Sequence, residues 1–467
     1  MFRLSFLYRL FTPTRQLLQL LTQNPGKNFS VAIRLRFVVL MVGMICLLPN
    51  SLSAQTLTMG DAIEQALANN FNLQFAKNNV RIASINDHPG QAGMLPVVGL
   101  QAGTTALVNN ISQKFVSGDE INRAGVFSSN TQFSVFSAWT LFDGFRMYAA
   151  RQRLKEQVAE AEIDLTAQML QTTRDVAALY LELMRQQELL KNTDTLIAIT
   201  NERLTLSKMR FESGLSSKTD YLQALTDVNA QAAQKLTQLN NLQQTKENLN
   251  LLMGRNVSTP FEIEEQSLPE ENWVLPEELN PAQHPLVRQV KTQIGIAQLQ
   301  QQEIEAGKYP TVDLNAAYNF NFNRSQAGFS LYNLSTGPVL GLNVNWTLFN
   351  GGNLKRAATV NHIAIETLRT SLAQTEQLLD AQWVQAQRNA AFARNLADLE
   401  TKNLEAISEN MLIALERLRA GVANTLEFRE AQQGYELMLA RKTEAQFQLK
   451  LAELNLLFLK GELIMQD

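Results

Sequence analysis

Apolar and polar residues alternate in three segments of the chain, and this alternation predicts β-strands. It is clearest over 313–323, recurs over 340–348 and is weaker over 132–141. Because successive side chains of a strand point to opposite faces, each segment would have one apolar and one polar face. We expect the segments 109–127 and 324–337 to be outward-facing loops that connect strands.

Two segments of 68 residues contain neither proline nor glycine, and they predict very long helices. They cover 146–213 and 353–420. A continuous helix of this length would measure about 100 Å. Apolar residues recur every seven positions in the first segment, which is typical of coiled-coil packing. These residues are Val176, Leu183, Leu190, Ile197, Leu204 and Phe211. The equivalent residues of the second segment are Trp383, Ala390, Ala397, Leu404, Met411 and Leu418.

Each long segment ends at a glycine, which predicts a tight turn. Gly214 and Gly421 are followed by shorter helical segments at 219–253 and 425–460. A helix, a glycine and a second helix indicate an antiparallel hairpin. The sequence therefore predicts two long helical hairpins.

The chain contains an internal duplication. The segment Trp139–Gly144 recurs as Trp346–Gly351, 207 positions later, and Gly214 recurs as Gly421 at the same offset. A constant offset over more than seventy residues is the signature of two structural repeats.

Upstream of the tryptophans the offset between the repeats changes. Leu95-Pro96 matches Tyr309-Pro310 at an offset of 214, so the first repeat has seven extra residues before its tryptophan. Short helices predicted at 57–83 and 284–306 open the two repeats.

The first 54 residues predict an export signal. Arg34 and Arg36 precede the apolar run 37–48, and small residues follow it. This order is typical of a signal peptide, whereas twelve apolar residues are few for the alternative, a membrane anchor. We divide the rest into a first repeat at 55–254, a connector rich in proline and glutamate at 255–283, and a second repeat at 284–467.

Composition and charge exclude several classes of function. Without the signal, 35 basic and 44 acidic residues give a net charge of −9, whereas a nucleic-acid-binding protein needs a basic surface. The only cysteine, Cys46, lies in the signal, and the three histidines, His88, His284 and His362, are far apart. Common catalytic and metal-binding motifs are missing. We expect no enzyme activity, no cofactor, no metal site and no nucleic-acid partner.

The predicted strands raise a problem that oligomerisation would solve. Two strands in each repeat make four in the chain, which are too few for a membrane barrel, and an open sheet in lipid would leave its edges unpaired. Two copies of the chain would supply eight strands and three would supply twelve. Trp139 and Trp346, near strand ends, suit the aromatic belt of a membrane interface. The alternative is a soluble sheet packed on helices.

The duplicated plan of two strands, a very long helix, a glycine turn and a returning helix resembles the TolC family of outer-membrane efflux channels. The repeated Trp-x-Leu-Phe-x-Gly at Trp139–Gly144 and Trp346–Gly351 is similar to the strand-to-helix signature of that family, as is Gly214 followed by Asp220-Tyr221. The resemblance covers residues 57–462.

The resemblance implies a mainly α fold with membrane β-structure. Three copies would share a 12-stranded barrel in the outer membrane, and their long antiparallel hairpins would form an α-barrel in the periplasm. The implied partners are a second and third copy, outer-membrane lipid, a periplasmic adaptor and an inner-membrane pump. The implied function is a passive duct for small toxic molecules.

The resemblance also implies a pore constriction at the hairpin turns. Its carboxylates would be Glu427 and Glu430, with Asp220 in the first repeat. Leu418 and Ala423 replace the tyrosine and arginine that close the constriction in family members, so we expect a different or a looser closure here.

Other functions stay open at this level. A duct of this kind could also export metal ions or serve type I protein secretion. An exported coiled-coil protein with a structural or adhesive role would explain the heptads and the signal, but not four amphipathic strands.

Overall fold

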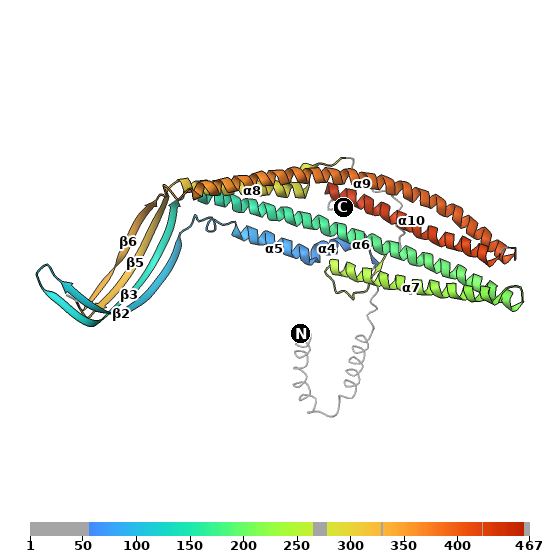
Figure 1. The fold of residues 1–467 in the computed structure, drawn as a ribbon, viewed down its shortest axis with the longest axis horizontal. Coiled ribbons are helices and arrows are strands. Elements are labelled where there is room, and N and C mark those ends of the chain that lie inside the picture. The colour runs from blue at the N-terminus through green and yellow to red at the C-terminus, as the bar shows by residue number, and fades with distance from the viewer. Residues whose placement is uncertain (1–55, 265–277, 328–329, 423, 462–467) are drawn as a thin grey trace, which may run out of the picture. The chain divides into compact units, whose positions relative to one another are not determined.

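Four long helices pack in pairs as two antiparallel hairpins (Figure 1). Helix α6 (Arg146–Glu212) pairs with α7 (Lys218–Leu252), and α9 (Asn353–Arg419) pairs with α10 (Thr425–Lys460). The two long helices contain 67 residues each, so the predicted lengths are confirmed to within one residue.

The computed structural model describes residues 56–264, 278–327, 330–422 and 424–461. The predicted signal at 1–54, the middle of the predicted connector and Ala423 lie outside the described residues. Among the described helices, none combines the length and the apolar character that crossing a membrane requires.

The short opening helix of the first repeat is divided in two. Helix α4 (Met59–Asn69) and helix α5 (Phe71–Asn86) replace the single helix expected at 57–83. Asn70 separates them because its extended backbone ends α4 and its side chain accepts hydrogen bonds from the first N–H groups of α5.

The second repeat opens with a single helix. Helix α8 (Pro285–Glu305) follows the 3₁₀ turn η1 (Pro281–Gln283) and continues into η2 (Ala306–Lys308). The helix expected at 284–306 is therefore confirmed.

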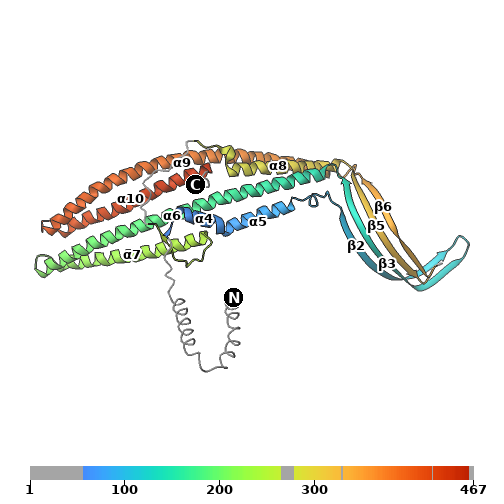
Figure 2. The ribbon, with the colours of Figure 1, turned by 180° about the vertical axis from the view of Figure 1, so that it is seen from behind.

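A four-stranded antiparallel sheet lies beyond one end of the helices (Figure 2). Its strands, in sheet order, are β2 (Val97–Lys114), β3 (Glu120–Phe142), β5 (Thr311–Ser325) and β6 (Tyr332–Asn345). A separate parallel pair joins β1 (Thr56–Leu57) to β4 (Glu262–Ile263).

The strands are longer than their alternation indicated, and the prediction of loops at 109–127 and 324–337 is wrong. Strand β2 continues to Lys114 and β3 begins at Glu120, while β5 continues to Ser325 and β6 begins at Tyr332. Main-chain hydrogen bonds to a neighbouring strand hold these segments extended although their side chains do not alternate cleanly.

The two repeats pair their strands in the same register. Val97 lies opposite Ala138 in the first hairpin of strands, and Thr311 lies opposite Asn345 in the second. These pairs are related by the offsets of 214 and 207 found in the sequence. The duplication therefore extends to individual residue pairs.

The heptad prediction holds for α9 but is wrong for the second half of α6. In α9 the predicted positions are buried with the exception of the half-buried Leu404. In α6 only Val176 and Leu183 are buried among the predicted residues. From residue 190 onward, the buried residues of α6 are Thr193, Leu196, Thr200, Arg203 and Ser207. This stripe faces a different neighbour because α6 contacts both α7 and α10.

Candidate functional site at the hairpin turns

The two hairpin turns share one backbone geometry. Gly214 has a φ of 75° and Gly421 a φ of 74°. After Gly214, the N–H of Leu215 donates to the carbonyl of Arg210 at 2.7 Å, and the turn at Gly421 repeats this bond. This closure of a helix end favours glycine because other residues rarely adopt the left-handed conformation.

A side chain caps each returning helix and orients one carboxylate. The hydroxyl of Ser217 accepts from the N–H of Asp220 at 3.2 Å, and the side chain of Asn424 accepts from the N–H of Glu427 at 2.7 Å. Asp220 and Glu427 are equivalent residues of the two repeats. Ser216 donates to the carboxylate of Asp220 at 2.6 Å, and this bond outweighs partial burial and lowers the pKa of Asp220.

Glu427 and Glu430, predicted for the constriction, line one groove of about 280 Å³ on the second hairpin. Arg417 at the end of α9 forms an ion pair with Glu427, with 2.7 Å between Nη1 and Oε1. The groove therefore combines two carboxylates with one guanidinium. Asp220 lies on the other hairpin, where its carboxylate accepts from Ser216.

A buried polar network connects the two hairpins a few turns above the glycines. Arg203 of α6 pairs with Asp227 of α7 and donates to Gln432 of α10 at 3.2 Å. Gln432 in turn donates to Thr200 at 2.6 Å, and Arg429 lies 3.4 Å from Asp227. Burial raises the pKa of Asp227, but the hydrogen bond from Arg203 and the charges of both arginines outweigh burial and lower it.

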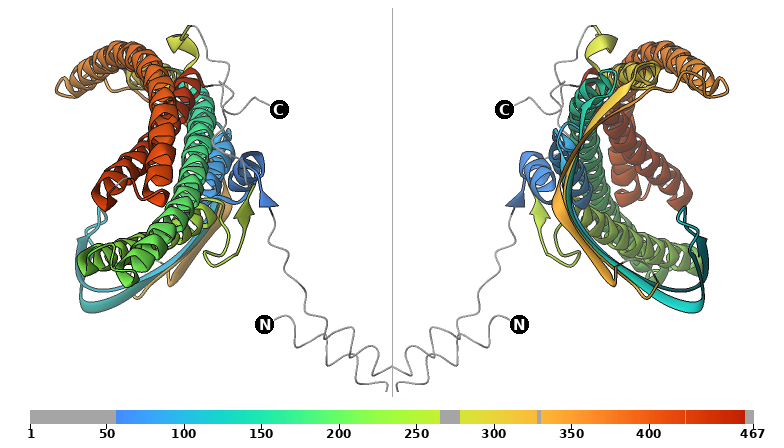
Figure 3. Two further views of the ribbon diagram at one scale, coloured as in Figure 1. Left: turned by 90° about the vertical axis from the view of Figure 1, so that its right-hand side faces the viewer. Right: turned by 90° about the vertical axis from the view of Figure 1, so that its left-hand side faces the viewer.

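Further polar contacts extend this connection along the helices. Arg419 of α9 pairs with Glu202 of α6 at 2.6 Å, and Gln231 of α7 donates to Glu436 of α10 at 3.0 Å. These contacts place the two hairpins of one chain side by side near their turns, as the end-on view shows (Figure 3).

Leu418 is part of the packing between the hairpins. Its side chain is 3% exposed and lies in an apolar cluster with Met411 and Phe428, against which Ile199 and Leu206 of the first hairpin pack. A leucine at this position therefore contributes burial rather than a hydrogen bond. Ala423, the second expected difference from the TolC family, lies outside the described residues.

Sequence reasoning missed Arg203. A signal existed, because Arg203 is spaced by three residues from Thr200 and by four from Ser207, the alternation of a coiled-coil seam. A charged residue in such a seam needs a buried partner. The more regular seven-residue repeat of apolar residues predicted that the neighbouring stripe is buried.

The two tryptophans occupy equivalent junctions between strand and helix. The indole N–H of Trp139 donates to the carbonyl of Met94 at 2.9 Å, and that of Trp346 donates to the carbonyl of Lys308 at 3.1 Å. Met94 and Lys308 are themselves equivalent at the offset of 214. Each partly exposed indole thus ties the end of one strand to the start of its neighbour.

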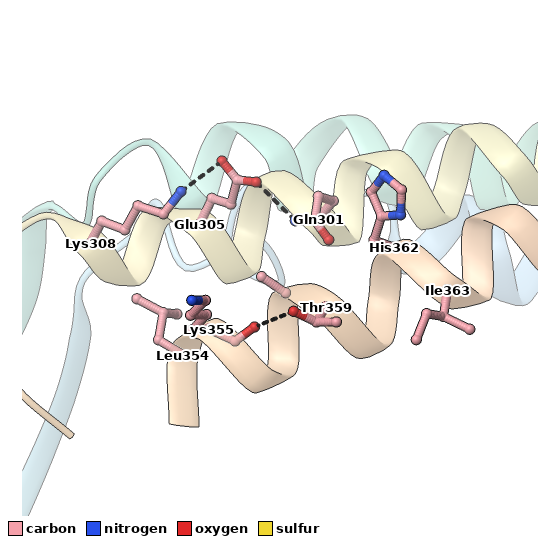
Figure 4. A pocket seen from close by; sticks show the side chains of 9 residues that line it. Gln301, Glu305, Lys308, Leu354, Lys355, Thr359, His362 and Ile363 are labelled. Carbon is pink, nitrogen blue, oxygen red and sulfur yellow. Dashed lines mark hydrogen bonds and ion pairs between the residues drawn. The ribbon is translucent and has the colours of Figure 1, made fainter. Parts of the chain in front are cut away.

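A second groove, of about 400 Å³, lies between α8 and α9 close to the sheet (Figure 4). Glu305 accepts from Gln301 at 2.8 Å and pairs with Lys308 at 3.1 Å, while His362 and Lys355 stand on the facing helix. Lys308, Lys355 and His362 are exposed and Glu305 is half-buried, so this groove has the character of an open helix surface.

The histidines do not converge on a site. His284 is 6% exposed and caps α8 by accepting from the N–H of Leu286 at 3.3 Å. Burial lowers the pKa of His284. Within the described parts of the chain, no group of three or more His, Cys, Asp or Glu residues could hold a metal ion.

The fold and the turns define a class of duplicated helical-hairpin proteins with an antiparallel sheet at one end. The chain belongs to the outer membrane efflux protein family, which it matches over residues 62–255 and 279–462. The resemblance to the TolC family of outer-membrane efflux channels is thereby confirmed. The protein is an outer-membrane protein of an efflux system and a member of a family of channel proteins.

Solved structures share this fold at low sequence identity. The outer-membrane channel OprN is 19% identical, with a TM-score of 0.73 over 86% of this chain and 90% of that chain. The Campylobacter jejuni CmeC channel is 14% identical, with a TM-score of 0.75 over 88% and 87% of the two chains. The Neisseria gonorrhoeae MtrE channel in its open state is 15% identical, with a TM-score of 0.67 over 86% and 89%. No curated protein sequence matches the chain.

Proposed function

We propose that three copies of the chain form a passive duct through the outer membrane. The observation that carries this proposal is the sheet of four antiparallel strands whose outer strands, β2 and β6, each pair on one side only within the described residues. An open edge in lipid is costly, and membrane barrels need at least eight strands. Three copies would supply twelve strands, and the hairpins would continue the duct into the periplasm.

The duct would carry small toxic molecules without chemistry of its own. An inner-membrane pump would supply the energy, and a periplasmic adaptor would connect the pump to the hairpin turns. Membership of the outer membrane efflux protein family supports this role, as does the likeness to CmeC and MtrE, which are described as outer-membrane channels. In this arrangement 1–54 is the export signal, 55–254 and 284–467 are the repeats, and 255–283 connects them.

Carboxylates at the turns would form the constriction of the duct. Three copies of Glu427 and Glu430 would surround the axis, with Asp220 of the first hairpin nearby. In each copy Arg417 neutralises Glu427. The ring would therefore still attract cations, but with a reduced negative charge. The polar network around Arg203 would hold the hairpins together in the resting state. It would replace the closing interaction of the family's tyrosine, which Leu418 cannot make.

Trp139 and Trp346 would mark the membrane interface on the periplasmic side. Trp139 lies near the end of β3 and Trp346 directly after β6, and both side chains are partly exposed. An indole with an exposed ring and a satisfied N–H suits the boundary between lipid and water.

The mass of the native protein tests this function. The protein would be extracted by detergent from an isolated outer-membrane fraction, and its mass would be measured by light scattering corrected for detergent. We expect three times the mass of the mature chain and ion conductance in planar bilayers. A monomer in the soluble periplasmic fraction would contradict the duct and would favour the exported coiled-coil protein.

A further inference from the structure

We propose that the groove between α8 and α9 binds the phosphate of a membrane glycerophospholipid in the periplasmic leaflet of the outer membrane. The groove has a volume of about 400 Å³ and lies at the end of both helices that is nearest to the sheet (Figure 4). This inference rests on the proposed duct, because a sheet that crosses the membrane brings the groove to the level of the lipid headgroups. The occupant is therefore a lipid of the surrounding membrane.

The apolar face of the sheet continues into the groove. Cross-strand partners share a face, and Leu342 lies opposite Leu314 on the apolar face. Val344 follows on the same face, and the alternation continues to Trp346. The indole N–H of Trp346 donates to the carbonyl of Lys308 at 3.1 Å, and Lys308 lines the groove. A surface that would contact lipid hydrocarbon therefore leads directly to a lysine.

The groove offers ammonium groups from two facing helices. Glu305 accepts from Gln301 at 2.8 Å and pairs with Lys308 at 3.1 Å, so two donors hold this carboxylate. Lys355 stands on α9 across the groove (Figure 4). It has no carboxylate partner in the part of the chain that the structure describes. Lys355 therefore supplies the uncompensated positive charge, and phosphate oxygens accept short, strong hydrogen bonds from such a group.

Below the tryptophan, the polarity of the groove changes stepwise along α9. Leu354 comes first and packs close to Gly307, where an added Cβ would lie 3.2 Å from its Cδ1 atom. Lys355 follows, and His362, about two turns further on, pairs with Glu366 at 3.5 Å. This order matches the hydrocarbon, the phosphate and the water at the edge of a membrane. Free phosphate would use the ammonium groups alone, whereas a lipid would also contact the leucine and the indole.

The first repeat provides an independent observation at the same level of the duct. Tyr148 is the equivalent of Lys355 at the offset of 207. The ring of Tyr148 lies 6.1 Å from that of Phe145, which lies 5.3 Å from that of Phe142. Both Tyr148 and Phe145 are more than half exposed. Exposed aromatic rings of this kind are typical of the boundary between lipid and water.

Phe145 holds this aromatic cluster in an unfavourable backbone conformation. Its φ of 69° lies in the left-handed region, which no other described non-glycine residue adopts, and its equivalent is Gly352 with a φ of 76°. Such a conformation strains a residue with a Cβ atom, and it is retained where the side chain has a role. Insertion of the ring into the headgroup layer provides that role. The two repeats thus meet one membrane boundary with aromatic rings in the first and ammonium groups in the second.

Native mass spectrometry of the purified trimer tests the site. The trimer would be delipidated in a non-ionic detergent and titrated with dioleoyl phosphatidylethanolamine, whose lack of net charge limits non-specific attraction. We expect one tightly bound lipid per copy. Lys355→Gln should weaken the dissociation constant of these lipids about ten-fold, because a charged hydrogen bond to the phosphate is lost.

Glu305 provides a test of opposite sign. Glu305→Gln removes a negative charge beside the phosphate and should strengthen binding about three-fold. Lys308→Gln removes the ion-pair partner of Glu305, so it should weaken binding by more than Lys355→Gln does. Adding Glu305→Gln to Lys308→Gln should restore part of the affinity. A groove that contacted only the acyl chains would show none of these changes.

The chain and the lipid each offer a matched control. Lys291→Gln makes the same change on α8, 17 positions before Lys308. That separation is about 25 Å along a helix, so binding should equal that of the unmodified protein. Dioleoylglycerol has the same acyl chains without the phosphate. It should bind more weakly, and with equal affinity to every variant.

The outcomes separate this inference from the proposed function. A trimer in which Lys355→Gln binds phosphatidylethanolamine as tightly as Lys291→Gln would overturn the lipid site and leave the duct standing. Displacement of the lipid by millimolar inorganic phosphate would identify a site for free phosphate and overturn the assignment to a lipid. A monomer in the soluble periplasmic fraction would overturn both the site and the duct.

Discussion

Replacing Arg203 with methionine should loosen the contact between the two hairpins. Its guanidinium is 3% exposed and bonds to Asp227 and Gln432, so it joins α6, α7 and α10. Methionine keeps part of the packing of the side chain but donates no hydrogen bond. Asp227 would retain Arg429 at 3.4 Å, and the side-chain oxygen of Gln432 would lose its donor.

The size of the effect follows from burial. Removing one partner of a buried ion pair costs about 3–5 kcal/mol. The side chain of Asp227 is 21% exposed and keeps a second arginine, so we expect about 2 kcal/mol. If this free energy stabilises only the closed arrangement, the ratio of open to closed channels rises about 30-fold.

Single-channel recording in planar bilayers would measure the open probability. The control is Lys235→Met, which breaks the exposed pair of Lys235 with Asp194 inside the first hairpin and should change the ratio less than about two-fold. Adding Asp227→Asn to Arg203→Met should recover part of the closed state, because it removes the carboxylate that the loss of Arg203 deprives of its partner. An open probability of Arg203→Met equal to that of Lys235→Met, in protein of normal native mass, would refute the reasoning.

Three further predictions concern the turns and the buried histidine. Glu427→Ala with Glu430→Ala should raise single-channel conductance or weaken block by divalent cations, and unchanged values of both would show that these carboxylates do not line the constriction. Gly214→Ala should speed hydrogen exchange of the Leu215 amide about five-fold, because the left-handed conformation costs alanine about 1 kcal/mol, and Gly214→Asn should have a smaller effect. Burial lowers the pKa of His284, so the folded state resists protonation of this imidazole. The contribution of neutral His284 to the free energy of unfolding is therefore present above the unfolded pKa near 6.5 and is lost as the pH falls through the folded pKa. His284→Asn keeps a capping side chain and should reduce the drop in melting temperature between pH 7 and pH 5, and an identical drop in both proteins would exclude this role.

Local signals in the sequence were sufficient for the helical hairpins. The absence of proline and glycine over 68 residues, followed by Gly214 or Gly421, predicted α6 and α9 to within one residue. Propensity and turn chemistry act between residues that are near in sequence, so they can be read without the fold. The same holds for the offset between the repeats.

Other features depended on segments that are far apart in the chain. Strand β3 extends beyond its alternating segment, and β2 forms where no alternating segment was identified, because each finds main-chain partners in a neighbouring strand. The division of α4 from α5 at Asn70 depends on a side chain that caps one helix and also donates to the carbonyl of Leu252 at 2.8 Å, 182 residues away.

By itself, then, the sequence determined the duplication, the helix lengths and the turns, because these follow from short-range preferences repeated at a constant offset. The tertiary structure alone decided which stripe of α6 is buried and which charged residues become partners. Arg203 finds Asp227 at a separation of 24 residues and Gln432 at a separation of 229. A buried charge is stable only where such partners meet, and packing of the hairpins decides where that is.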